Sequence, residues 1–339
     1  MLEAFLKTLV SLGLVAVGAA YVRGWWRLRA AGYPSPRWRL ALYVLGLATI
    51  AAALLSPLDD LAAERFSAHM GQHLLLTMAA APLLVLGNPF PLVLWGLPAH
   101  ARRALGTTLR RGAPLRAALS ALTVFPVGGV LHVATVWVWH LPFMYDAAVE
   151  HELVHAVEHA TFFSTAILFW WPIVQPAPRL HPRPHPGFQI LYLVLATAQN
   201  TALGMLLAVP ERAFYPHYVR RAAALGISAV DDQMLGAGLM WSGGHMYLLP
   251  ILLILWGLAR DAMSERSTPI MRGSPRPSAS AQSTIKCSAV ASCGAAATCT
   301  CFRFSSSSMV SRAKPCARRT TRRRSRGSKM VAPRGFARY

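Results

Sequence analysis

The sequence predicts an all-α fold, a polytopic membrane bundle of about seven transmembrane helices. Three observations lead to this prediction. Hydrophobic residues make up 54% of the 339 positions and charged residues only 14%, which is unusual for a soluble protein. Seven apolar stretches are long enough to cross a hydrocarbon core, which takes about 20 helical residues. The loops between these stretches alternate between basic and acidic character.

The expected spans, in chain order, are 3–22, 40–57, 69–89, 119–140, 152–175, 188–209 and 233–259. Each is expected to be helical, because a segment inside lipid must satisfy its own backbone polar groups. The first, LEAFLKTLVSLGLVAVGAAYV, runs straight into RGWWRLR without a convincing processing site. We therefore interpret it as a span and not as a cleaved signal peptide.

The charge of the loops predicts the orientation of the bundle. Loops 23–39 and 90–118 carry five arginines each, whereas loops 58–68 and 141–151 are mainly acidic. Basic loops of membrane proteins stay in the cytoplasm. We therefore expect the N-terminus outside the membrane and the C-terminus in the cytoplasm.

Composition divides the chain into two parts, a transmembrane domain (1–262) and a basic Ser/Arg-rich cytoplasmic tail (263–339). All five cysteines lie in the tail, and all twelve histidines precede it. The tail has no hydrophobic periodicity and is expected to be disordered. Its polybasic end could contact anionic lipid or nucleic acid nonspecifically, and no specific nucleic-acid partner is expected. It is either a lineage-specific appendage or a frameshift product, and we assign it no function.

Histidines gather toward the predicted outer side of the membrane. His69 and His73 lie one turn apart on the third span, and His155 and His159 do the same on the fifth. His140 ends the fourth span on the same side. Ionisable side chains inside a span are costly and usually face a bundle interior. The two histidine pairs are therefore candidates for one shared site.

These side chains suit a metal ion. Imidazole binds copper, zinc and iron, and the thioether of a neighbouring methionine, Met70, favours reduced copper. Copper is therefore the expected cofactor. Haem is the alternative, because a histidine from each of two helices can ligate its iron. Zinc hydrolysis is disfavoured, because HMGQH lacks a glutamate and HAVEH places Glu158 outside the H-E-x-x-H order. Glu158 is expected to orient a metal-binding imidazole without itself binding the metal.

Three segments together resemble the polytopic CtaG family of assembly factors for caa-type cytochrome c oxidases. They are SAHMGQHLLLTMAAAPLLVLGNP, VWHLPFMYDAAVEHELVHAVEHATFFSTAILFWWPI and DDQMLGAGLMWSGGHMYL. The resemblance covers about residues 40 to 260. It implies a multi-pass protein of the bacterial cytoplasmic membrane that helps to make active haem–copper oxidase. Its implied partners are cytochrome c oxidase subunits and membrane lipids.

The resemblance also implies which positions carry the family motifs. They are His69, His73, His140, Tyr145, Asp146, His155, His159, Asp232, Gln233, Trp241, Gly243 and Gly244. His245, in the same last segment, is a further candidate. Asp146 is interpreted as a cap for the fifth span, with a role near a metal entrance as the other possibility.

The leading hypothesis is a non-enzymatic assembly factor whose outer histidines take copper, expected as Cu(I), and aid formation of an oxidase metal centre. One alternative is a haem-binding membrane redox protein that uses the histidine pairs of spans three and five. Another is a metal-ion transporter with Asp146, His155 and His159 along its pathway. The sequence has no nucleotide-binding loop, nucleophile elbow or haem-attachment cysteine pair, so no catalytic activity is expected.

Overall fold

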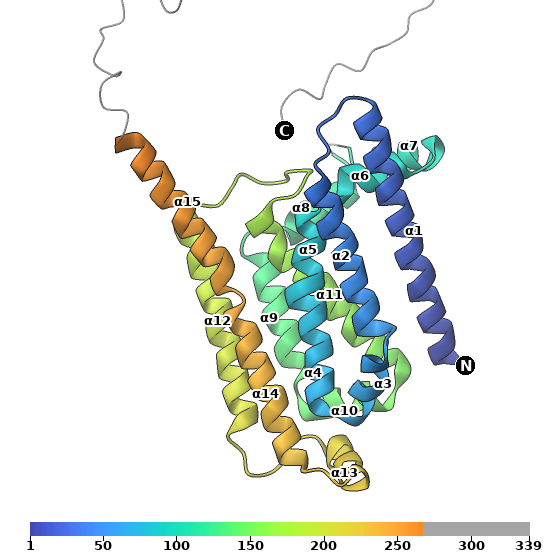
Figure 1. The fold of residues 1–339 in the computed structure, drawn as a ribbon, viewed down its shortest axis with the longest axis vertical. Helices are drawn as coiled ribbons and strands as arrows, with labels where there is room; N and C mark the ends of the chain where they lie inside the picture. Colours follow the sequence, from blue (N-terminus) through green and yellow to red (C-terminus); the bar gives the residue numbers. More distant parts are fainter. Residues whose placement is uncertain (111, 267–339) are drawn as a thin grey trace, which may run out of the picture. The chain divides into compact units, whose positions relative to one another are not determined.

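The computed structural model describes residues 1–110 and 112–266, with side chains up to residue 260. Every regular element in these residues is a helix, which confirms the predicted all-α class. The predicted disordered tail lies, from residue 267 on, outside the described residues. In chain order the helices are α1 (Leu2–Ala30), α2 (Arg37–Leu54), α3 (Pro57–Glu64), α4 (Phe66–Leu74), η1 (Leu75–Ala80), α5 (Ala81–Leu86), α6 (Pro89–Gly96), α7 (Ala99–Thr108), α8 (Pro114–Leu122), α9 (Val127–Trp139), α10 (Pro142–Glu150), α11 (Glu152–Val174), α12 (Pro186–Ala208), α13 (Pro216–Leu225), α14 (Ala229–His245) and α15 (Leu248–Arg266) (Figure 1).

Proline sets the start of many of these helices. It is the first residue of α3, α6, α8, α10, α12 and α13. There its fixed φ suits a helix, and its missing N–H would have had no partner in any case. Proline also disfavours a helical conformation in the residue before it. A long apolar chain is divided into separate helices in this way.

Five helical segments of the described residues are long and apolar enough to cross a membrane. They are α1, α2, Phe66–Leu86, α12 and Ala229–Arg260. These segments correspond to the predicted spans one, two, three, six and seven. The third is a continuous rod in which the π-helical turn η1 joins α4 to α5.

The other two predicted spans look different in the structure. Residues 119–140 do not form one helix, because α8 and α9 meet at an angle of 70°. Pro126 lies between them and interrupts the helical hydrogen bonding. Helix α11 covers nearly all of the predicted span 152–175, but it is not among the candidate spans of the described residues. The structure thus has five candidate spans, or six with the bent pair, and the seven-span count and the orientation stay predictions.

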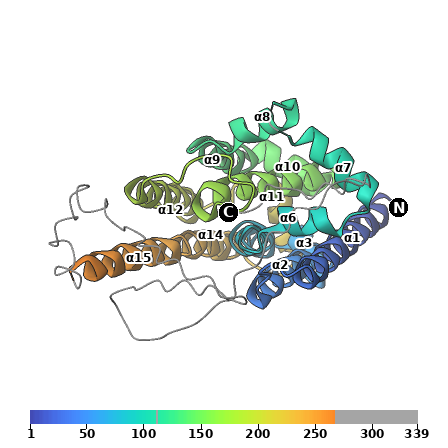
Figure 2. The same cartoon turned by 90° about the horizontal axis from the view of Figure 1, so that it is seen from above.

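The rod Phe66–Leu86 forms the centre of the bundle. In an apolar 18-residue window of this span 61% of the residues are buried, against 6% in the corresponding window of α1. Helix α4 packs against α3 and α14, while η1 and α5 pack against α2 and α11 (Figure 2). The central position of the rod explains why polar side chains at its start can be sheltered from lipid.

Two glycines of α14 let it approach the rod closely. A Cβ at Gly236 would overlap the ring of Phe66, and a Cβ at Gly243 would overlap the side chain of Leu74. A larger residue at these positions would force either these side chains or α14 itself to shift. The glycines therefore help to position the helix that carries His69 and His73.

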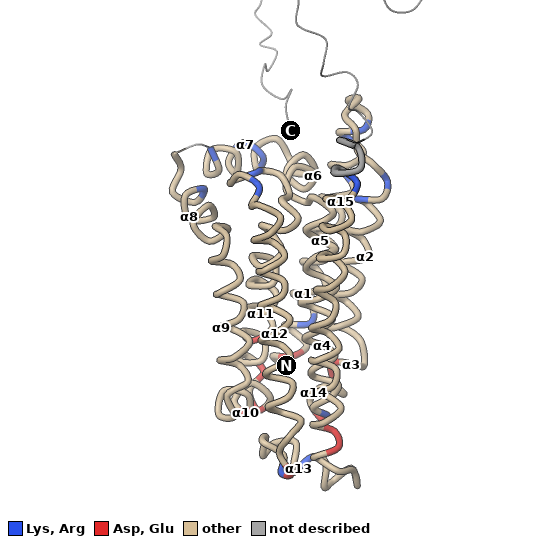
Figure 3. Tube along the Cα trace, turned by 90° about the vertical axis from the view of Figure 1, so that its left-hand side faces the viewer, with Lys and Arg blue, Asp and Glu red and all other residues tan. Residues whose placement is uncertain are grey.

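Charge is distributed unevenly along the bundle (Figure 3). Lysines and arginines gather at the end that holds α7 and α8, while acidic residues lie toward the opposite end, around α3, α10 and α14. Helix α4, with its histidines, begins at the acidic end.

Candidate metal centre

Four buried side chains from α4 and α11 converge near the start of the central rod. Helix α4 contributes His69 and His73, and α11 contributes Glu158 and His159. One ligand atom from each side chain lies within 4.8 Å of the ligand atoms of the other three. We call these four residues the histidine–glutamate cluster. The cluster thus contains both histidines of the first predicted pair and one histidine, His159, of the second.

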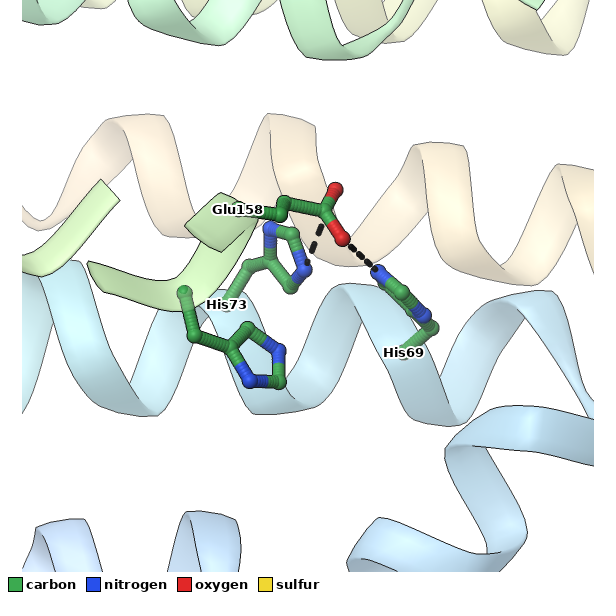
Figure 4. A group of neighbouring side chains, drawn as sticks. His69, His73 and Glu158 are labelled. Atoms are coloured by element: carbon green, nitrogen blue, oxygen red, sulfur yellow. Dashed lines mark ion pairs between the residues drawn. The ribbon is translucent and has the colours of Figure 1, made fainter. Parts of the chain in front are cut away.

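The Glu158 carboxylate lies between the two imidazoles of α4 (Figure 4). Its Oε2 is 3.5 Å from Nε2 of His69, and its Oε1 is 3.7 Å from Nε2 of His73. These separations are too long for good hydrogen bonds. Glu158 was expected to orient an imidazole from behind, but the structure places its oxygens among the candidate ligand atoms. The helical spacing of HAVEH, which puts Glu158 and His159 beside His155, was the signal for this.

Most polar atoms of the cluster lack hydrogen-bond partners. The described residues contain fourteen buried side-chain nitrogen and oxygen atoms without a partner. Seven of them belong to five histidines and one glutamate, namely His69, His73, His140, His155, His159 and Glu158. A buried polar atom without a partner costs about 1–3 kcal/mol. Such a concentration in one place calls for an explanation, and a shared cation would provide one.

Two further histidines border the cluster. The ring centroid of His155 lies 4.2 Å from that of His159 and 5.2 Å from that of His69. His140 bonds through Nδ1 to the carbonyl oxygen of Val136 at 2.7 Å, and its Nε2 has no partner. His140 also lines a small cavity together with His73. Both residues adjoin the cluster without belonging to the four closest ligands.

Met70, the predicted thioether ligand, lies on α4 next to His69. It lies beside Phe66 and packs against Gly236 of α14, where a Cβ would meet Met70 Cγ at 3.2 Å. Met70 also lines the small cavity that His73 and His140 share. The predicted thioether ligand thus packs against α14 and lines a cavity beside the cluster, and its binding to copper stays a prediction.

A tyrosine that sequence reasoning missed determines the tautomer of His69. The Tyr218 hydroxyl donates to the carbonyl oxygen of Ala62 at 2.6 Å and also lies 3.2 Å from Nδ1 of His69. Its single proton is already used, so Nδ1–H of His69 donates to it. Nε2 of His69 then keeps a free lone pair that faces Glu158. Burial raises the pKa of Tyr218 well above its usual value, which keeps the phenol neutral.

Tyr145, a motif position, lies beside the same histidine. Its ring stacks on Tyr215 at 4.0 Å between centroids and lies 5.1 Å from the ring of His69. Its hydroxyl is buried without a hydrogen-bond partner, and burial raises its pKa well above the usual value. Tyr145 therefore forms a neutral aromatic wall of the cluster.

Asp232 fixes the start of the helix that carries the histidines. Helix α4 has no capping side chain of its own. Asp232 of α14 accepts hydrogen bonds from the backbone N–H of Phe66 at 2.7 Å and of Ser67 at 3.3 Å, and from the Ser67 hydroxyl. A carboxylate in this position satisfies N–H groups that would otherwise lack partners. The neighbouring Gln233 accepts from Phe214 N–H and donates to the carbonyl oxygen of Leu207.

The remaining motif residues lie away from the cluster. Asp146 accepts from the backbone N–H of His217 at 3.3 Å, so it caps α13 and not the predicted fifth span. Trp241 and His245 are exposed on α14, and Nδ1 of His245 bonds to the carbonyl oxygen of Trp241. His132, at 3.1 Å from the Thr165 hydroxyl, is a hydrogen-bonded core residue.

Comparison with known proteins identifies related sequences. Residues 19–261 match the family described as cytochrome c oxidase caa3 assembly factor (Caa3_CtaG). Among curated proteins, the uncharacterized protein ML1998 of Mycobacterium leprae is 25% identical over 260 residues, which is 74% of this chain and 38% of that protein. The uncharacterized protein Mb0105 of Mycobacterium bovis is 26% identical over 254 residues, with the same coverage. The chain thus matches about two fifths of these longer relatives. No solved structure matches it.

Proposed function

Because the chain belongs to the family of cytochrome c oxidase caa3 assembly factors, we propose that it binds one copper ion in the histidine–glutamate cluster and aids formation of an oxidase metal centre. The convergence of His69, His73, Glu158 and His159 carries this proposal. The role is non-enzymatic, and its partners are cytochrome c oxidase subunits. The protein acts in the bacterial cytoplasmic membrane, with the cluster toward the outer face.

The spacing of the ligand atoms suits one ion. Ligands at 2.0–2.2 Å from a tetrahedral metal lie about 3.3–3.6 Å from one another. The two separations between Glu158 and the imidazoles, 3.5 and 3.7 Å, are close to this range. Nε2 of His69 is already unprotonated by virtue of Tyr218, so it can bind a cation without losing a proton.

The chemistry of the four ligands is compatible with copper. Imidazole binds copper in both oxidation states, and the hard carboxylate of Glu158 adds a preference for Cu(II). A thioether would favour Cu(I), and Met70, the predicted thioether ligand, lines the small cavity beside His73. The haem–copper oxidases that this family helps to assemble need copper, which favours it over zinc or iron in this site.

A metal-content measurement tests the proposal. The full chain is purified in lipid nanodiscs, exposed to Cu²⁺, freed of excess metal and analysed for copper and for its visible spectrum. We expect the variant His73→Ala/His159→Ala to contain about one copper less per chain than the parent. The control is His245→Ala, which removes an exposed histidine outside the cluster and should keep all the copper. Any copper bound by the tail cysteines is the same in all three proteins.

Two results would contradict the proposal. Equal copper in the parent and in the double variant would show that the cluster is not the site. A Soret band in the parent that disappears in the variant would instead support the haem-binding redox protein.

In bacterial cells that lack this chain, the parent should restore cytochrome c oxidase activity and the double variant should not.

A further inference from the structure

A large cavity reaches the histidine–glutamate cluster from the side of α1. Its volume is about 710 Å³, and residues of α1, α2, α3, α10 and α11 line it. His155 and His159 form part of its wall, together with apolar residues such as Leu14 and Phe163. His159 is only 8% exposed, and its Nε2 is buried without a partner. The lining of the cavity thus includes a candidate metal ligand.

Acidic side chains are concentrated in the lining of this cavity. The whole chain has 13 acidic residues and a net charge of +21. Six of those acids line the cavity, against two basic residues, Lys7 and Arg221. The six are Glu3, Asp59, Asp60, Glu64, Glu150 and Glu152. Such a concentration of negative charge beside low-dielectric walls attracts cations and speeds their association.

Part of this negative charge is not neutralised locally. Lys7 pairs with Glu3 at 2.7 Å and with Asp59 and Asp60 at 3.1 Å. Glu150 pairs with Arg220 outside the lining. Glu64 and Glu152 form no ion pair among the residues that the structure describes. These two carboxylates therefore add most directly to the attraction of a cation.

We propose that this acidic cavity is the route by which a metal cation reaches the histidine–glutamate cluster, with His155 as the transfer ligand. His155 lines the cavity and its ring lies 4.2 Å from that of His159, so an ion bound to it can exchange this bond for bonds to the cluster. The exchange changes neither the charge nor the oxidation state of the ion. This inference rests on the proposed copper site, but it concerns the rate of binding and not the site itself.

The test measures how fast Cu²⁺ binds to the full chain in nanodiscs of zwitterionic lipid. Binding is followed by stopped-flow quenching of tryptophan fluorescence, and bound copper is counted at the end. The test variant is Glu64→Gln/Glu152→Gln. Its matched control is Glu211→Gln/Asp231→Asn, which removes the same charge from two exposed acids outside the cavity. Glu152 and Asp231 each lie in the first turn of a helix, so both variants lose a similar helix-dipole contribution.

We expect the test variant to bind copper about 3–10-fold more slowly than the parent at low ionic strength, with unchanged stoichiometry. The difference should disappear in about 0.5 M salt, where the charges are screened. His155→Ala should also slow binding while keeping the copper count.

Equal rates for the parent and the test variant, with copper bound in both, would overturn the route and leave the proposed site intact. Equal slowing by the test and control variants would also overturn it, because the effect would then come from net charge alone. A parent that binds no copper would overturn the proposed function, and the route with it.

Discussion

Removal of the carboxylate of Asp232 should loosen the helix that carries two of the proposed ligands. In Asp232→Ala, the backbone N–H groups of Phe66 and Ser67 lose their acceptor, and so does the Ser67 hydroxyl. Loss of a side-chain helix cap costs about 0.5–2 kcal/mol, and hydrogen bonds to a charged acceptor contribute about 1.5–3 kcal/mol. Because the three bonds are partly buried, we expect a loss of about 2–3 kcal/mol in the free energy of unfolding.

Thermal unfolding of the full chain in detergent, followed by circular dichroism, measures this loss. For a protein of this size, 1 kcal/mol corresponds to about 2–4 °C, so the melting temperature should fall by about 5–10 °C. The control is Asp231→Ala, which removes the exposed neighbouring carboxylate on the same helix and should cost less than 2 °C. Copper affinity should also fall in Asp232→Ala, since the cap lies one turn before His69. The same melting temperature in both variants would refute the view that Asp232 anchors α4.

Three further predictions concern the cluster and its support. Tyr218→Phe should lower copper affinity about 10–100-fold, because His69 is then no longer held in one tautomer. Tyr247→Phe, which changes a buried tyrosine elsewhere, should leave the affinity unchanged. Competition with a chelator measures both affinities. Glu158→Gln should weaken copper binding at least tenfold. It should not lower the melting temperature of the metal-free protein, because it removes a buried charge. A lower melting temperature with unchanged copper affinity would contradict this prediction. Gly243→Ala should lower the free energy of unfolding by about 1–3 kcal/mol, because its Cβ overlaps Leu74. Gly238→Ala, in open space on the same helix, should not destabilise the protein. Equal melting temperatures for the two variants would argue against close packing of α14 on α4.

Helical spacing in the sequence predicted three residues of the cluster, His69, His73 and His159, as candidate ligands. Residues four apart share one face of a helix, so His69 with His73 and His155 with His159 could be paired without a structure. The same rule applied to HAVEH would have placed Glu158 on that face. Whether two faces meet depends on helix rotation, which only the packing of the bundle determines.

The supporting contacts could not be predicted from local sequence. Tyr218 is separated from His69 by 149 positions, and Asp232 from Phe66 by 166. Each makes its contact because α13 and α14 fold back beside α3 and α4. The prediction of the number of spans was limited for a different reason. An apolar composition does not reveal a bend, although Pro126 followed by two glycines in FPVGG indicated a break within 119–140.

The distances along the chain have a consequence for biosynthesis. During translation α4 is made well before α13 and α14, and Tyr218 follows His69 by 149 residues. At about 5–20 residues per second, this delay is roughly 7–30 s. Throughout that interval the nascent chain has imidazoles but neither the tyrosine that selects their tautomer nor the aspartate that anchors their helix. The ribosome must finish α13 and α14 before the supporting contacts are complete, so the two supporting residues are added last, to a chain that already carries all four candidate ligands.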